Sequence, residues 1–143
     1  MMEQVDFYLL GPVDDAGKLK VACRIANKAH ERGMKIYMQT GDQQQSRFLD
    51  SLLWTFSQES FVPHALREPG MDWRKFPIQI GPGNSGVEDL DLLISLQAEV
   101  PIDAAKYKRI ADFIVDNAEQ KQLGRVRFRY YRENGIEPKI HQL

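Results

Sequence analysis

The stretch YLLGPVDDAGKLKVA places Gly11, Gly17 and Lys18 in a turn between an apolar run and a helical pattern, where phosphate-binding loops occur. In such loops, backbone N–H groups surround the phosphates, a lysine neutralises them and a following hydroxyl holds magnesium. Here five residues, rather than four, separate Gly11 from Gly17, and a leucine follows Lys18 where the hydroxyl residue should stand. In addition, Asp14 and Asp15 would repel a phosphate. The sequence therefore predicts a capped strand-to-helix turn without a functional phosphate loop. A small nucleotide-dependent enzyme stays as an alternative hypothesis.

A second chemical pattern is the run of cations in EQKQLGRVRFRYYREN. Four of them share one face of the helix that this stretch predicts, at spacings of four, four and three: Lys121, Arg125, Arg129 and Arg132. We call these four residues the arginine ridge, and Phe128 stands beside it. Like charges at such spacings cost a helix roughly a few tenths of a kcal/mol each unless something compensates them. Three interpretations stay open: a solvated face, a groove for an acidic peptide with an apolar anchor, or a single-stranded DNA site where Phe128 and Tyr131 stack on bases.

The connecting segment SLLWTFSQESFVPHAL is rich in aromatic side chains. Trp54 and Phe56 end a predicted helix, and Phe61 follows after a polar break. Large aromatic side chains on a connecting segment are typical of the central residues of protein–protein interfaces. The alternative is that all of these rings belong to the core.

The remaining reactive side chains form no recognisable site. His64 is near Ser57 and Ser60 only, and we expect it to be a partly exposed loop residue. The three histidines lack metal-ligand spacing, and Cys23 lies among apolar helix positions, as a buried small side chain would. We therefore predict no catalytic residue, cofactor or metal, and we do not expect an enzyme.

An α/β scaffold is expected to position these groups. Short apolar runs predict buried strands at 5–10, 35–40, 76–80, 91–96 and 107–115, with loops at 67–75 and 81–89. Helical spacing and capping residues predict helices at about 14–32, 42–56 and 117–134. In the last helix, Leu123, Val126 and Tyr130 are expected to face the core. The alternation of strands and helices predicts a small α/β sandwich with a mostly parallel sheet.

Composition restricts the class of protein. A chain of 143 residues, 43% hydrophobic and 27% charged, is typical of one soluble globular domain over 1–143. No apolar stretch approaches the roughly 20 residues of a membrane-spanning helix. The acidic start is unlike a signal peptide, so we expect a cytoplasmic protein. Residues 117–143 hold six basic and three acidic side chains, against 13 and 17 elsewhere, which indicates a local basic patch for an acidic partner.

Four blocks of the sequence, namely VDFYLL, LW with SFVPH, DLLISL and the last predicted helix, together resemble the chi subunit family of the bacterial DNA polymerase III holoenzyme. The resemblance runs from about Val5 to Gly135 in matching order, through VDFYLL, LW followed by SFVPH, DLLISL, and a final helix with R-x-R-[FY]-[RK]-x-Y-R ending in x-x-G. It implies an α/β topology similar to that of nucleotide-binding proteins, without nucleotide activity. It also implies a non-catalytic adaptor of the clamp-loader complex that contacts DNA only indirectly.

The resemblance further implies two partners and their sites. It places the psi subunit of the clamp loader on Trp54 and Phe61. It places the acidic C-terminal tail of single-stranded DNA-binding protein, which ends in aspartates, Ile, Pro and Phe, on the arginine ridge and Phe128. Arg125 and Arg129 would then grip carboxylates in a forked geometry, while Phe128 and the arginine stems wall a pocket for the terminal ring. Phe128 resembles a family tyrosine but lacks the hydroxyl, so a hydrogen bond through that group is absent.

Overall fold

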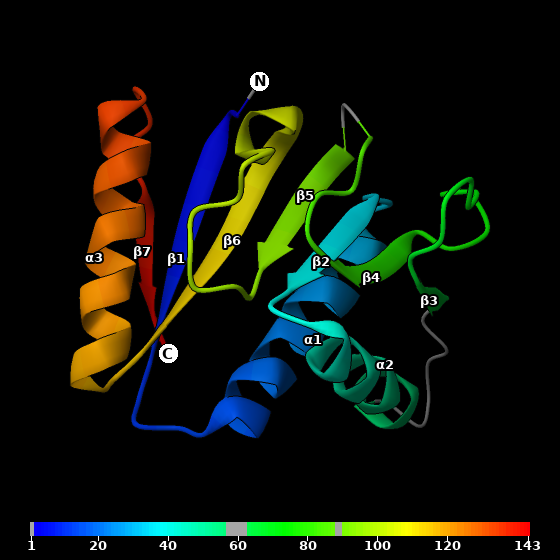
Figure 1. Ribbon diagram of the computed structural model, residues 1–143, viewed down its shortest axis with the longest axis horizontal. Coiled ribbons are helices and arrows are strands. Elements are labelled where there is room, and N and C mark those ends of the chain that lie inside the picture. The colour runs from blue at the N-terminus through cyan, green and yellow to red at the C-terminus, as the bar shows by residue number, and fades with distance from the viewer. Residues whose placement is uncertain (1, 57–62, 88–89) are drawn as a thin grey trace.

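The computed structural model describes residues 2–56, 63–87 and 90–143, which form one seven-stranded sheet with helices on both faces (Figure 1). The strands are β1 (Gln4–Leu10), β2 (Ile36–Thr40), β3 (His64–Leu66), β4 (Ile78–Pro82), β5 (Leu90–Ser95), β6 (Tyr107–Val115) and β7 (Lys139–Gln142). The helices are α1 (Asp15–Glu31), α2 (Gln43–Phe56) and α3 (Ala118–Glu133), with a short 3-10 turn, η1 (Ala104–Lys106). The predicted α/β sandwich is confirmed. None of the helices in the described ranges is long and apolar enough to cross a membrane.

The sheet is ordered β3-β4-β2-β5-β6-β1-β7, and every strand pair among the described residues is parallel. The short strands β3 and β7 therefore form its two edges. Because β1 lies between β6 and β7, Tyr8 has Phe113 as its neighbour on one side and His141 on the other. Parallel pairing also brings the carboxyl ends of the strands to one end of the sheet.

Each face of the sheet carries its own core. On one face, α1 and α2 bury apolar side chains such as Leu19, Cys23 and Leu49 against Met38 and Ile94. On the other face lies a smaller core that includes Phe7, Tyr107 and Tyr131, and α3 contributes to it over β1 and β6. The prediction that Cys23 is buried is confirmed. The helices α1 and α3 therefore lie on opposite faces of the sheet.

All three helix starts are closed by their own side chains. Asp14 accepts a hydrogen bond from the Gly17 N–H at 2.8 Å, and Asn117 accepts one from Gln120 at 2.9 Å. At α2, Asp42 accepts from the Gln45 N–H at 2.7 Å, and the Gln45 side chain accepts from the Gly41 N–H at 2.8 Å. The caps at Asp14 and Asp42 are those that the sequence predicts, and each carboxylate occupies a backbone donor that a phosphate would need.

Three predictions about the strands are wrong in part. The edge strands β3 and β7 were not predicted, because runs of three and four residues carry almost no periodic signal. Strand β4 extends to Pro82, into the segment predicted as a loop. His64, predicted as a partly exposed loop residue, instead lies in β3 and is only 5% exposed. Its Nε2 is 3.3 Å from Asp50 Oδ1.

The face of α3 that packs on the sheet also differs from the prediction. Three residues of α3 are buried: Gly124, Arg127 and Tyr131. Val126 is 57% exposed and Tyr130 is 40% exposed, so the prediction that both face the core is wrong, and Leu123 is half-buried. The apolar pattern is misleading here because one buried position holds an arginine, which finds an acidic partner in β6.

Candidate functional site

The rotation of α3 about its axis is set by a buried ion pair. Arg127 donates from Nε to Asp112 Oδ2 at 2.9 Å and from Nη2 to Oδ1 at 3.0 Å, and it also donates to the carbonyl oxygens of Ala98 and Phe113 at 2.8 and 3.1 Å. Burial raises the pKa of the Asp112 carboxyl, and the charge of Arg127 opposes that shift. With Arg127 held inward, the arginine ridge on the other side of α3 faces outward.

A groove of about 570 Å³ lies between α3 and the strands β1, β6 and β7. Its apolar floor consists of Phe7, Leu9, Ile114 and Ile140, and its rim holds Arg125, Phe128, Arg129, Arg132 and Glu133. A second hollow of about 360 Å³ shares Leu9, Ile114 and Arg125 with the first and reaches Lys121. The structure therefore places all five residues predicted for the acidic-peptide site along two adjoining hollows, four of them at the first and Lys121 at the second.

The four cations of the arginine ridge are exposed but differ in their partners. Lys121 Nζ lies 2.6 Å from Asp116 Oδ1, and Arg132 Nε lies 3.2 Å from Glu137 Oε2. Both pairs are solvent-exposed, and exposed pairs contribute little free energy. Arg125 and Arg129 have no carboxylate partner in the part of the chain that the structure describes. Their two guanidinium groups, in the middle of the ridge, are therefore available to an anionic ligand.

Phe128 joins the core to the rim of the groove. Its half-buried ring packs edge-on against Phe7, with centroids 5.3 Å apart, and the Arg132 guanidinium lies 5.9 Å from its centre. Tyr131 is fully buried, so the interpretation in which Tyr131 stacks on a DNA base is wrong. One half-buried ring is a poor platform for successive bases, whereas it can wall a pocket for a single apolar side chain.

Gly124 brings the backbone of α3 close to the floor of the groove. A Cβ atom at this position would lie 2.5 Å from Ile114 Cδ1 and 2.6 Å from Cγ1. Contacts this short do not occur without displacement of one partner. A larger residue at this position would displace either the Ile114 side chain or α3, so glycine allows the present close packing of α3 on β6.

Gly124→Ala is expected to destabilise the fold by about 1–3 kcal/mol, because overpacking outweighs the better helix propensity of alanine. Urea unfolding followed by circular dichroism measures this change. In an Ile114→Ala background the same substitution should be neutral or stabilising, because the clashing atoms are gone. A stabilising effect of Gly124→Ala in the otherwise unaltered chain would contradict the close approach.

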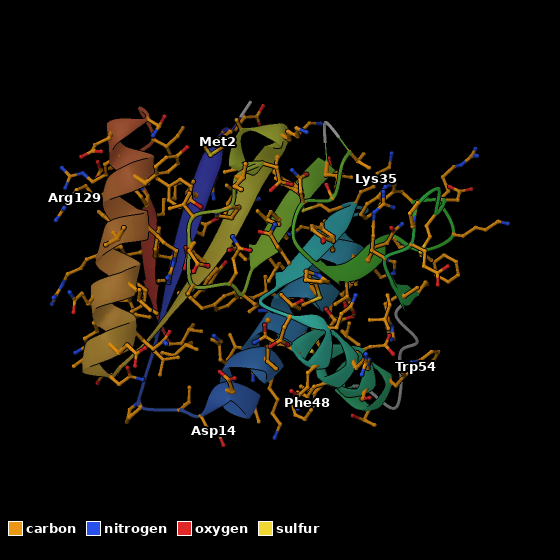
Figure 2. The ribbon with its side chains drawn as sticks, in the orientation of Figure 1. Met2, Asp14, Lys35, Phe48, Trp54 and Arg129 are labelled. Atoms are coloured by element: carbon orange, nitrogen blue, oxygen red, sulfur yellow. The ribbon has the colours of Figure 1, made fainter. Side chains whose placement is uncertain are left out.

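The aromatic segment lies at the other side of the molecule. Trp54, near the end of α2, is 55% exposed and its ring contacts that of His64, with centroids 4.7 Å apart. Figure 2 shows Trp54 and Arg129 on opposite sides of the fold. Phe61, the second residue predicted for this site, lies outside the described residues. Trp54 is therefore well separated from the arginine ridge, and the two lie near opposite edges of the sheet (Figure 2).

The carboxyl end of the sheet holds a hollow of about 680 Å³, between the starts of α1 and α2 and the end of β5. This is where parallel α/β sheets bind ligands such as nucleotides. Here the helix starts are capped by Asp14 and Asp42, and Lys18 is 3.8 Å from Asp15. The described residues contain no group of three or more His, Cys, Asp or Glu that could hold a metal ion. This donor set does not favour a nucleotide phosphate.

Comparisons with known proteins match nearly the whole chain. The family model described as DNA polymerase III chi subunit, HolC, matches residues 2–139. A Pseudomonas aeruginosa protein named DNA polymerase III subunit chi is 37% identical over 142 residues, which cover 99% of this chain and 98% of that protein. Proteins of the same name from Escherichia coli and Haemophilus influenzae are 32% and 28% identical, each over 94% of this chain and over 95% and 94% of their own length.

Proposed function

This chain belongs to the DNA polymerase III chi subunit family, and from that premise we propose that it is a non-catalytic adaptor linking single-stranded DNA-binding protein to the psi subunit of the clamp-loader complex. Family membership makes it a replication-associated subunit. The observation that carries the finer proposal is the pair of exposed, uncompensated guanidinium groups of Arg125 and Arg129 above an apolar floor.

The groove has the chemistry that an acidic tail ending in Ile, Pro and Phe requires. Arg125 and Arg129 can each form two parallel N–H bonds to a carboxylate, from an aspartate or from the chain terminus. Leu9, Ile114 and Ile140 provide an apolar floor for the terminal ring, and Phe128 stands at the rim. Such a tail is disordered when free, so the ordering that binding requires holds the affinity to a modest level.

Titration of a labelled peptide ending in Asp-Asp-Ile-Pro-Phe tests the tail-binding part. We expect saturable binding that weakens as salt rises from about 50 to about 300 mM, because exposed charges are screened. Amidation of the terminal carboxylate should reduce the affinity roughly tenfold, since one charge-assisted contact is lost. Fluorescence anisotropy measures both effects. Non-saturable binding, or equal affinity of the free and amidated peptides, would reject this mode of recognition.

Trp54→Ala tests the part of the proposal that concerns psi. If Trp54 is a central contact, its truncation should weaken association with psi by about 2 kcal/mol or more while leaving the tail peptide affinity unchanged. Phe48→Ala is the matched control, because Phe48 is an exposed aromatic residue on the same helix (Figure 2). Calorimetry with purified psi measures both. Equal losses for the two variants would argue against a specific role of Trp54.

A further inference from the structure

A second row of cations lies along α1 and its C-cap residue, on the opposite face of the sheet from the arginine ridge. Its members are each four residues apart: Lys20, Arg24, Lys28 and Arg32. We call these four residues the α1 ridge. All four are exposed, and within the described part of the chain none has a carboxylate partner. At the helical rise, the row is about 18 Å long with a charge about every 6 Å.

A hollow of about 250 Å³, lined by both apolar and charged side chains, opens beside this row, between α1 and the sheet. Arg24, Lys28 and Arg32 line it from the helix, and Arg109 lines it from β6. The apolar part of its lining includes Val21, Ile25, Met34, Leu92 and Ala111. Three ridge cations therefore border a space that fits an aliphatic side chain.

The acidic side chain that lines this hollow does not neutralise the α1 ridge. Asp6 is buried, and its carboxylate accepts hydrogen bonds from Arg109 at 3.3 Å and from the Gln4 amide at 2.9 Å, while His141 Nε2 lies 2.8 Å from it. Burial opposes ionisation, but these hydrogen bonds, that from His141 first, hold the pKa of Asp6 below its usual value. The carboxylate is thus paired with Arg109, and the charges of the ridge stay uncompensated.

The hollow is unsuited to a nucleic acid base. Tyr8 is the one aromatic residue among those that line it. The Tyr8 ring stacks with Phe113 on one side and His141 on the other, at centroid distances of 5.6 and 4.9 Å. Single-stranded nucleic acid binding depends on rings with a free face, so the arrangement favours an aliphatic side chain over a base.

We propose that the α1 ridge and its hollow dock an extended acidic peptide segment of a partner protein. In an extended peptide, side chains alternate between two directions, and every second residue is about 6.5–7 Å further along. That repeat is close to the distance between successive ridge cations. Carboxylates at alternate positions can therefore meet Arg24, Lys28 and Arg32, while an aliphatic side chain between them enters the hollow. Neighbouring like charges on α1 oppose helix formation, and such a ligand offsets this repulsion.

The probe for this site is a labelled Asp-Leu-Asp-Leu-Asp peptide, acetylated and amidated so that no terminal carboxylate can engage the arginine ridge. We expect saturable binding at low salt by fluorescence anisotropy. Arg24→Glu/Lys28→Glu should weaken it about tenfold or more, since two attractive charges become repulsive. A peptide with serine in place of leucine should bind several-fold more weakly. Amide chemical shifts in NMR should change along α1 and at Met34 rather than along α3.

Two matched variants separate this site from general electrostatics. Arg74→Glu/Lys75→Glu makes the same change of charge in an exposed loop, and Arg125→Glu/Arg129→Glu makes it on the arginine ridge. The loop variant should bind the probe as tightly as the unaltered chain, and the arginine-ridge variant should weaken binding less than Arg24→Glu/Lys28→Glu does. Equal weakening by either variant, or no saturable binding, overturns the proposal. Tighter, ridge-dependent binding of a labelled oligo-dT would instead make the α1 ridge a nucleic acid surface. Arg24→Gln/Lys28→Gln replaces the charge reversal if that variant does not fold.

Discussion

Arg127→Ala is expected to lower the free energy of unfolding by about 3–5 kcal/mol, because it leaves the carboxylate of Asp112 buried without its cation. Asp112 lies in the middle of β6, under α3, where water does not reach it. The same substitution leaves the carbonyl oxygens of Ala98 and Phe113 without a donor that they now have. Urea unfolding at neutral pH measures the loss, which is a large part of the stability of a domain of this size.

Arg129→Ala is the matched control for this prediction. Arg129 lies on the same helix but is exposed and has no carboxylate partner in the described chain, so its removal should change stability by less than about 0.5 kcal/mol. A double variant, Arg127→Met/Asp112→Leu, should recover most of the stability, because no charge is then buried. If Arg127→Ala and Arg129→Ala are equally mild, the ion pair does not hold α3 in place.

The sign of the pH dependence provides an independent check on Arg127→Ala. Without the cation, the pKa of Asp112 in the folded state should rise further above its value in the unfolded chain. A group of this kind contributes stability that is present below its unfolded pKa and is lost as pH rises through the folded pKa. The deficit of the variant relative to the unaltered chain should therefore be smaller near about pH 5 than near about pH 8.

The buried ion pair also shows where inference from sequence ends. Helical spacing was sufficient to predict the arginine ridge, since Lys121, Arg125 and Arg129 share a face in any helix with this register. The same spacing assigned Val126 and Tyr130 to the core, because apolar type was the only guide to the buried face. Which face is buried depends on Asp112, and an acidic residue inside an apolar strand is visible in sequence but has no partner until the fold provides one.

The apolar floor of the groove could not be predicted from sequence, for a related reason. Its side chains come from β1, β6 and β7, and their meeting depends on the parallel register of three strands, one of which is only four residues long. The main strands and all three helices could be predicted because each carries its own periodic pattern. In contrast, the α1 ridge has a clear sequence signal, four cations at intervals of four residues, that hydrophobic periodicity alone does not reveal.

Arg125→Glu/Arg129→Glu is expected to reduce the affinity for the acidic tail peptide by about 100-fold or more. Both substitutions replace an attractive charge with a repulsive one at the middle of the groove. Opposite charges that lose water at an interface can lower the binding free energy by several kcal/mol, and like charges can raise it by a similar amount. Because both side chains are exposed and have no carboxylate partner in the described chain, the fold should keep its stability. Fluorescence anisotropy with the peptide ending in Asp-Asp-Ile-Pro-Phe measures the loss.

A charge-swapped peptide distinguishes lost electrostatic contacts from a damaged groove. A peptide with lysines in place of the two aspartates should bind the double variant more tightly than the acidic peptide does, because its lysines face the two new glutamates. The apolar floor of Leu9, Ile114 and Ile140 is unchanged and can still hold the terminal ring. The unaltered chain should show the opposite preference. A reversal of this kind arises only if the two guanidinium groups face the acidic residues of the tail. If the double variant binds neither peptide, the charge reversal has disturbed the groove itself, and Arg125→Gln/Arg129→Gln should then give a smaller loss that depends less on salt.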